Sequence, residues 1–243
     1  MEELLTSHFW LGLGAIIWVN IILSGDNAVV IALAARSLPA HQQTKAVIWG
    51  AGAAVVLRIV LTIVAVELLK LSYLKLLGGA LLFWIAVKLL MPEHGDDGIE
   101  SPGNLLQAIK TILIADLVMS LDNVIAVAAA AKGSIMLLVL GLLISIPLVV
   151  YGATMLMKLM VRFPSIITIG AALIGYVSGE MPVTDPAVVE WFEINARWLI
   201  NFEVFAVGEV KLKLSAAGLI AGAFVVALGK LLAARQTRAE QGT

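Results

Sequence analysis

The feature that most constrains the fold is a series of apolar runs separated by short segments rich in proline, glycine or charge. A helix that crosses a bilayer needs about 20 consecutive, mainly apolar residues. Runs of about this length lie at residues 8–35, 45–69, 73–91, 105–131, 134–157, 164–180 and 212–234. The pattern predicts an all-α, polytopic membrane protein, with about seven transmembrane helices in a single membrane domain over residues 1–243.

Composition supports this class and excludes others. Of the 243 residues, 61% are hydrophobic and 14% are charged, whereas a soluble domain is roughly half apolar and a quarter charged. The net charge of −1 provides no basic field for nucleic acid, and the absence of cysteine excludes disulfides and thiolate metal sites. The first run lacks a basic leader and a convincing cleavage site, so we expect a permanent span rather than a signal peptide.

If the seven spans cross the membrane in turn, lysine and arginine are modestly more frequent in the segments that fall on one side of it. The positive-inside rule then places the N-terminus outside and the C-terminus in the cytoplasm, in a multi-pass protein of the cell (inner) membrane. The linker 92–104 is expected to be cytoplasmic. Residues 181–211 mix acidic and aromatic side chains and face outward, in an amphipathic pattern that suits an interfacial helix.

One short motif occurs twice within the apolar runs, as Ser24-Gly25-Asp26-Asn27-Ala28 and as Ser120-Leu121-Asp122-Asn123-Val124. The match extends backward, because Asn20 stands four residues before Ser24 and Asp116 stands four residues before Ser120. A carboxylate at membrane depth is costly, so it is rare without a partner or a function. The repeated motif therefore indicates a functional site.

The motif also indicates an internal repeat. Setting Asp26 against Asp122 aligns the first span with the fourth, and a small shift aligns Gly78-Gly79 with Gly170-Ala171. Because three spans separate the two halves, the second half enters the membrane from the opposite side. This predicts a 3+3 inverted-topology repeat, with three helices in 8–91, three in 105–180, and one extra C-terminal helix.

The repeated residues supply only oxygen donors. On a helix, Asn20, Ser24 and Asn27 share one face, as do Asp116, Ser120 and Asn123, and Ser24-Gly25 favours local unwinding that exposes backbone carbonyls. Carboxylate, amide and hydroxyl oxygens suit Mg²⁺, Ca²⁺ and Mn²⁺ equally, and no histidine lies within a span core. The expected metal ligands are Asp26, Asn27, Asp122, Asn123, Asp116, Asn20, Ser24 and Ser120.

Charge balance adds one more residue. Three carboxylates around a divalent ion leave about one negative charge, which Arg58 in the second span could balance. Proton exchange is a second way to balance it, since burial and like charges favour a protonated carboxyl when the ion leaves. The polar side chains have a purely structural alternative, because serine and asparagine often join helices in lipid, and Arg58 could simply pair with one aspartate.

At these motifs the chain resembles the TerC family of integral membrane proteins, in its YjbE-like branch. The resemblance rests on the segments 18–28 and 115–124 and on Gly78-Gly79-Ala80-Leu81-Leu82 with Lys88. It implies a metal site formed by Asp26, Asn27, Asp122 and Asn123, supported by Asn20 and Asp116. It also implies manganese, because some relatives look like manganese exporters. The family is named for tellurium resistance, but clustered acids would repel an oxyanion.

The function expected from these features is secondary transport, exporting a hard divalent cation, with Mn²⁺ as the leading substrate. The chain has no phosphate-binding loop, so ATP is not the expected energy source, and we expect neither an enzyme nor a permanently bound cofactor. Two alternatives stay open: an exporter of a small organic cation, and a non-transporting membrane partner in a metal or tellurium stress-resistance complex. An intramembrane hydrolase with paired aspartates fits less well, because each aspartate precedes an asparagine in a symmetric repeat.

Overall fold

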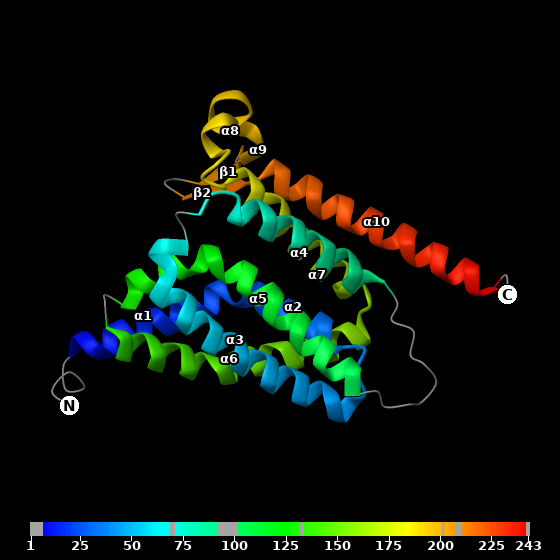
Figure 1. Ribbon diagram of the computed structural model, residues 1–243, viewed down its shortest axis with the longest axis horizontal. Helices are drawn as coiled ribbons and strands as arrows, with labels where there is room; N and C mark the ends of the chain where they lie inside the picture. Colours follow the sequence, from blue (N-terminus) through cyan, green and yellow to red (C-terminus); the bar gives the residue numbers. More distant parts are fainter. Residues whose placement is uncertain are drawn as a thin grey trace. The chain divides into compact units, whose positions relative to one another are not determined.

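The computed structural model describes residues 7–68, 71–91, 102–131, 134–200, 202–207 and 210–241, which are almost entirely helical (Figure 1). The helices are α1 (Ser7–Leu23), α2 (Gly25–Ala35), α3 (Ala40–Leu68), α4 (Leu74–Leu90), α5 (Pro102–Ala131), α6 (Ile135–Arg162), α7 (Ser165–Val183), α8 (Val189–Asn195), α9 (Arg197–Ile200) and α10 (Ala216–Gln241). One antiparallel hairpin, β1 (Phe202–Val207) with β2 (Val210–Leu214), is a small addition to the predicted all-α class.

Several helices are suited to a membrane. Among the described residues, four are long and apolar enough to cross one: Ala40–Val64, Ile135–Arg162, Ser165–Val183 and Ala216–Gln236. They correspond to the second, fifth, sixth and seventh predicted spans. The other three predicted ranges are also helical, but the first is divided between α1 and α2, and α4 has only 17 residues. The total of seven spans stays a prediction.

The segment between α7 and α10 differs from the predicted interfacial helix. It forms the short helices α8 and α9 and then the hairpin, so the predicted start of the last span at residue 212 is wrong. The reason is visible in β2, whose sequence Val-Lys-Leu-Lys-Leu alternates with the period of a strand. Helix α10 begins after Ser215, whose Oγ accepts a hydrogen bond from the Gly218 N–H at 3.2 Å and so caps the helix.

The chain divides into two compact units. Unit 1 contains α1, α2, α3, α5 and α6, and unit 2 contains α4, α7 to α10 and the hairpin. Each unit takes helices from both predicted repeats, so the boundaries of the units and of the repeats do not coincide. The core of unit 1 is aliphatic and is formed by Leu13, Ile16, Val55, Val127, Leu137, Leu138 and Leu142.

In unit 2, helix α7 packs between α4 and α10 through small residues. A Cβ atom on Gly79 of α4 would lie 2.7 Å from the Ser178 carbonyl oxygen of α7, and one on Gly222 of α10 would lie 2.7 Å from the Ala172 carbonyl oxygen. Such small residues let membrane helices approach closely. Phe83 and Phe224 stack beside them, with ring centroids 5.8 Å apart.

In unit 2, one buried carboxylate stabilises the start of α4 by hydrogen bonds to its backbone. Asp185, which follows α7 and is fully buried, accepts hydrogen bonds from the backbone N–H groups of Tyr73, Lys75, Leu76 and Ala187 at 2.8–3.2 Å. The first turn of a helix has N–H groups without partners, and three of these bonds satisfy donors there or just before it. Tyr73 has a positive φ of 67°, which these bonds help to hold.

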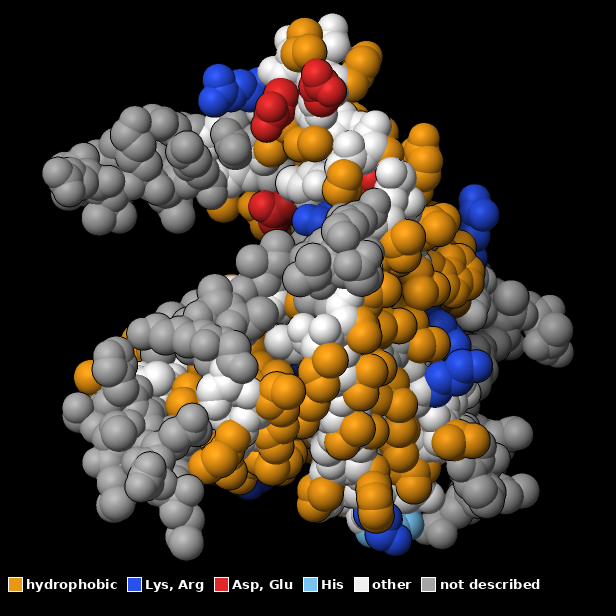
Figure 2. Space-filling view, turned by 60° about the vertical axis from the view of Figure 1, so that its left-hand side comes forward, with side chains coloured by type: hydrophobic (Ala, Val, Ile, Leu, Met, Phe, Trp, Pro, Cys, Tyr) orange, Lys and Arg blue, Asp and Glu red, His pale blue; other side chains and the backbone are white. Residues whose placement is uncertain are grey.

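The surface is apolar over wide areas. Large side chains such as Trp49, Trp84 and Tyr151 are 63–71% exposed. Figure 2 shows hydrophobic side chains covering much of one face. Soluble monomers rarely expose such extensive apolar surface, so these helix faces are those of a protein surrounded by lipid.

Candidate cation site

The first copy of the repeated motif breaks its helix. α1 ends at Leu23 and α2 begins at Gly25, with Ser24 between them at φ −106° and ψ 3°. The predicted unwinding is therefore confirmed here. In the second copy α5 continues without interruption through Ser120 and Asn123, because Leu121, a good helix former, stands where the first copy has Gly25.

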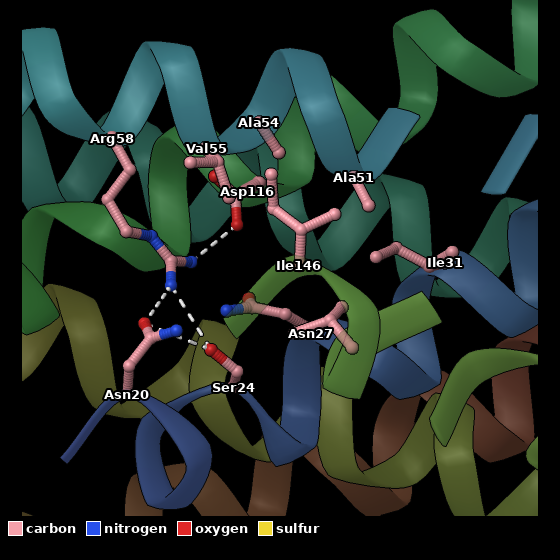
Figure 3. A pocket seen from close by; sticks show the side chains of 11 residues that line it. Asn20, Ser24, Asn27, Ile31, Ala51, Ala54, Val55, Arg58, Asp116 and Ile146 are labelled. Atoms are coloured by element: carbon pink, nitrogen blue, oxygen red, sulfur yellow. Dashed lines mark hydrogen bonds and ion pairs between the residues drawn. The ribbon is translucent and has the colours of Figure 1, made fainter. Parts of the chain in front are cut away.

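A buried guanidinium joins the two copies of the motif in unit 1. Arg58 of α3 is 4% exposed and lies at the centre of a polar network (Figure 3). Its Nη1 donates to Asn20 Oδ1 at 2.8 Å and to Ser24 Oγ at 3.2 Å, on the first copy. Its Nε donates to Ser120 Oγ at 3.0 Å, and its Nη2 forms an ion pair with Asp116, on the second copy.

The two copies hold the guanidinium in the same way. Ser24 Oγ donates to Asn20 Oδ1 at 3.3 Å, and Ser120 Oγ donates to Asp116 Oδ2 at 3.2 Å. Each copy thus presents a serine bonded to the residue four positions earlier, one helical turn away. Asn20 also lies in the last turn of α1, where the helix dipole carries partial negative charge. The site is therefore built to hold a positive charge.

Asn27 faces the same region with an unsatisfied side chain. It is 3% exposed, and neither its Oδ1 nor its Nδ2 has a hydrogen-bond partner in the described part of the protein. It lines a cavity of about 20 Å³, together with Asn20, Ser24, Ile31, Ala51, Ala54, Val55, Arg58, Asp116, Ile146 and Val149 (Figure 3). Such a volume holds one particle of the size of a water molecule. A buried amide beside such a cavity indicates a site for a small polar ligand.

A larger cavity adjoins the small one. It measures about 180 Å³ and is lined by Asn20, Ser24, Gly25, Ala28, Ser145, Leu148, Val149 and Gly152. Asn20, Ser24 and Val149 line both cavities, so these three residues form the boundary between them. The contribution of α6 is one that the sequence reasoning missed. The sequence features that could have indicated it are Ser145 and Pro147, which lie within one apolar span.

Not every predicted ligand joins this site. Asp26 is partly buried in the first turn of α2 and accepts a hydrogen bond from the Asn27 N–H at 2.8 Å, but it lines neither cavity. Asn123 is partly exposed and likewise lines neither. The Asp122 side chain lies outside the described part of the chain. Across the residues that are described, no three histidine, cysteine, aspartate or glutamate side chains are grouped so that they could hold a metal.

Known proteins similar to this chain are membrane proteins. The model of the integral membrane protein TerC family matches residues 5–235. The chain is 42% identical over 177 residues to YjbE of Bacillus subtilis (strain 168), an uncharacterized membrane protein, covering 73% of this chain and 81% of that protein. YceF of the same organism is 26% identical over 190 residues, covering 74% of each chain. No solved structure matches. The family match over nearly the whole chain confirms the resemblance seen in the motifs, and the chain belongs to the TerC family of integral membrane proteins.

Proposed function

We propose that this protein is a secondary transporter that exports a hard divalent cation, with Mn²⁺ as the leading candidate. It would lie in the cell (inner) membrane with its N-terminus outside and its C-terminus in the cytoplasm. The ion would bind among the repeated Asp, Asn and Ser residues. No catalytic step is part of this proposal.

The observation that carries the proposal is the convergence of both motif copies on one buried positive charge. Four side-chain oxygens, from Asn20, Ser24, Asp116 and Ser120, already surround a cation in the form of the Arg58 guanidinium. Oxygen donors of this kind are also the ligands that hard divalent ions prefer. A buried polar site of this kind inside an apolar helical unit is characteristic of transport pathways.

The break in the first helix supports a transport role. In transporters built from inverted repeats, a discontinuous helix near the repeat interface lines the substrate site. Here the helix break at Ser24 lies next to Arg58, and α3, α5 and α6 complete the surroundings of the site. The 180 Å³ cavity would give the ion a way to reach Asn20 and Ser24.

The same cavity favours a second candidate substrate, a small organic cation. Its walls include the apolar side chains of Ala28, Leu148 and Val149, and its boundary with the small cavity carries the oxygens of Asn20 and Ser24. An ammonium group could bind at those oxygens while the rest of the molecule occupies the larger cavity. This version uses the same site and differs only in the cargo.

Ion flux into proteoliposomes tests the proposal. We would compare the native chain with Asp26→Asn and Asp122→Asn under an imposed pH gradient, using Glu190→Gln, an exposed acid on α8, as the matched control. We expect the native chain and the control to move Mn²⁺ and both aspartate variants to lose the flux. Competition by Mg²⁺, Ca²⁺ and small ammonium compounds then ranks the substrates.

Two results would count against transport of a divalent ion. If no divalent ion moves while an ammonium compound does, the organic cation is the substrate. If nothing moves, the protein is better explained as a non-transporting membrane partner. If both aspartate variants keep full flux, the protein transports the ion without Asp26 and Asp122, and the site must be formed by the oxygens around Arg58.

A further inference from the structure

The Arg58 guanidinium occupies the oxygens that a transported cation would need. Of the eight predicted ligands, Asn20, Ser24, Asp116 and Ser120 each accept a hydrogen bond from it. Two of them belong to each copy of the motif. Arginine suits such a role, because its planar group carries five donors in a fixed geometry and keeps its charge even when buried.

The repeat makes this arginine exceptional. Aligning Asp26 with Asp122 and Gly78 with Gly170 places the counterpart of Arg58 within residues 150–154, Val-Tyr-Gly-Ala-Thr, where no basic residue occurs. The ligand residues occur in both halves, but the cation that they hold comes from one half. A guanidinium that only balanced the charge of Asp116 would have no need to engage Asn20 and Ser24 as well.

Electrostatics makes the guanidinium and a divalent ion alternatives at this site. Arg58 and Asp116 together are neutral, so a divalent ion added beside them would meet the positive charge of the guanidinium within a few ångströms. Repulsion at such a distance is strong where the surroundings are apolar. The ion would also need the lone pairs that Arg58 now uses. Asn27, whose buried amide has no partner among the described residues, lies beside the cavity where an ion could begin to bind.

We propose that Arg58 is a tethered substitute for the transported cation: it fills the oxygen cage of the ion-free protein and is displaced when the ion binds. This inference rests on the proposed function. The site then holds a positive charge both with and without the bound ion. The buried oxygens therefore keep a partner while the ion-free protein returns to the conformation that binds the next ion. Rebinding of Arg58 would also help to expel the ion at the exit side.

Equilibrium binding tests the inference. We would titrate Mn²⁺ into the full chain in lipid nanodiscs, comparing the native protein with Arg58→Gln and Arg58→Lys, and with Lys158→Gln, an exposed residue of α6, as control. If the guanidinium fills the cage most of the time, the apparent dissociation constant of the native protein is raised by the inverse of the free fraction. We expect Arg58→Gln to bind Mn²⁺ about tenfold more tightly but to export it more slowly, because release loses its competitor.

The lysine variant keeps the test decisive if the glutamine variant does not fold. Lysine retains the charge but cannot engage four oxygens in the same geometry, so Arg58→Lys should bind Mn²⁺ more tightly than native and less tightly than Arg58→Gln. Equal or weaker binding by folded variants, beside a native chain that binds and transports, overturns the displacement and leaves the proposed function intact. A native chain that neither binds nor transports Mn²⁺, Mg²⁺ or Ca²⁺ overturns both.

Discussion

At the residue scale, single polar groups carry much of the specificity of this structure. Asp185 is an example, because it connects the turn after α7 to the start of α4 by bonds to Tyr73, Lys75 and Leu76, more than 100 residues earlier in the chain. Burial alone would raise the pKa of its carboxyl. The backbone donors from Ala187, Tyr73, Leu76 and Lys75 outweigh that effect and hold the pKa below its usual range.

Asp185→Asn should therefore lower stability by about 1–3 kcal/mol, because the amide keeps one acceptor oxygen and leaves two of the four backbone N–H groups without an acceptor. Because the folded pKa lies below the unfolded one, the stabilisation by Asp185 is fully present above the unfolded pKa, near 4, and is lost as pH falls through the folded pKa. Thermal unfolding in detergent at neutral pH and at a pH below the folded pKa measures this. The variant should differ from native at neutral pH and converge with it in acid, with exposed Glu193→Gln as control. A constant difference at both pH values would contradict the account.

Asn27 gives a prediction of the opposite sign. Its buried Oδ1 and Nδ2 atoms lack hydrogen-bond partners among the residues that the structure describes, and such groups carry a desolvation cost of about 1–3 kcal/mol. Asn27→Leu, a change of similar size, should raise the melting temperature while abolishing ion flux. Loss of both stability and flux would instead mean that the amide supports the fold.

How far the sequence predicts the site depends on the range of the contacts. The stripes Asn20–Ser24 and Asp116–Ser120 were predictable, because helical periodicity alone brings residues four apart together. That Arg58 would engage both stripes at once was not predictable, since it requires α3 to pack against α5 and α2 so that the Arg58 side chain also reaches Asn20 on α1. Asp185 was identified in the sequence only as one acid of an amphipathic segment. Its partners lie on a distant part of the chain, which no local pattern reveals.

At the element scale, small residues and helix breaks determine how the helices meet. Ser24-Gly25 predicted the break between α1 and α2, and the same reasoning explains why α5 stays continuous. The apolar residues of β2 favoured a longer last helix in the sequence prediction. Their alternation with lysine has the period of a strand, and the segment forms a strand. If the protein is a non-transporting membrane partner, the segment 181–211 is a candidate for contacting other proteins. Deleting this segment would also remove Asp185 and so disturb the start of α4. Substitution of the exposed Trp191 and Trp198 tests such contacts without that side effect.

The contact between α4 and α7 yields a paired prediction. In Gly79→Ala the new methyl group would meet the Ser178 carbonyl oxygen and the Pro182 ring at 2.7 Å, so the helices must move apart. We expect a loss of about 1–3 kcal/mol, as for other overpacked sites. Gly52→Ala on α3 meets nothing within 4 Å and should be neutral or stabilising, because alanine favours helix. Thermal unfolding in detergent compares the two. Equal effects would show that the contact at Gly79 is not tight.

At the scale of the whole molecule, the membrane class follows from composition, and the family match agrees with it. The division into two units does not follow from the sequence. Local hydropathy reports which segments are apolar, but not which helices pack together, and here each unit combines helices from both predicted repeats. That combination brings the two motif copies into one unit. The two copies of the motif therefore form one site rather than two independent sites.

The most direct measurement is the number of Mn²⁺ ions bound per chain in lipid nanodiscs, detected by electron paramagnetic resonance. We expect one ion per native chain, with oxygen ligands only, and loss of that ion in Asn20→Leu and in Asp116→Asn taken singly, because each copy of the motif contributes to one site. Two ions per chain with one retained in each variant, directly bound nitrogen, or no bound ion at all would contradict this expectation.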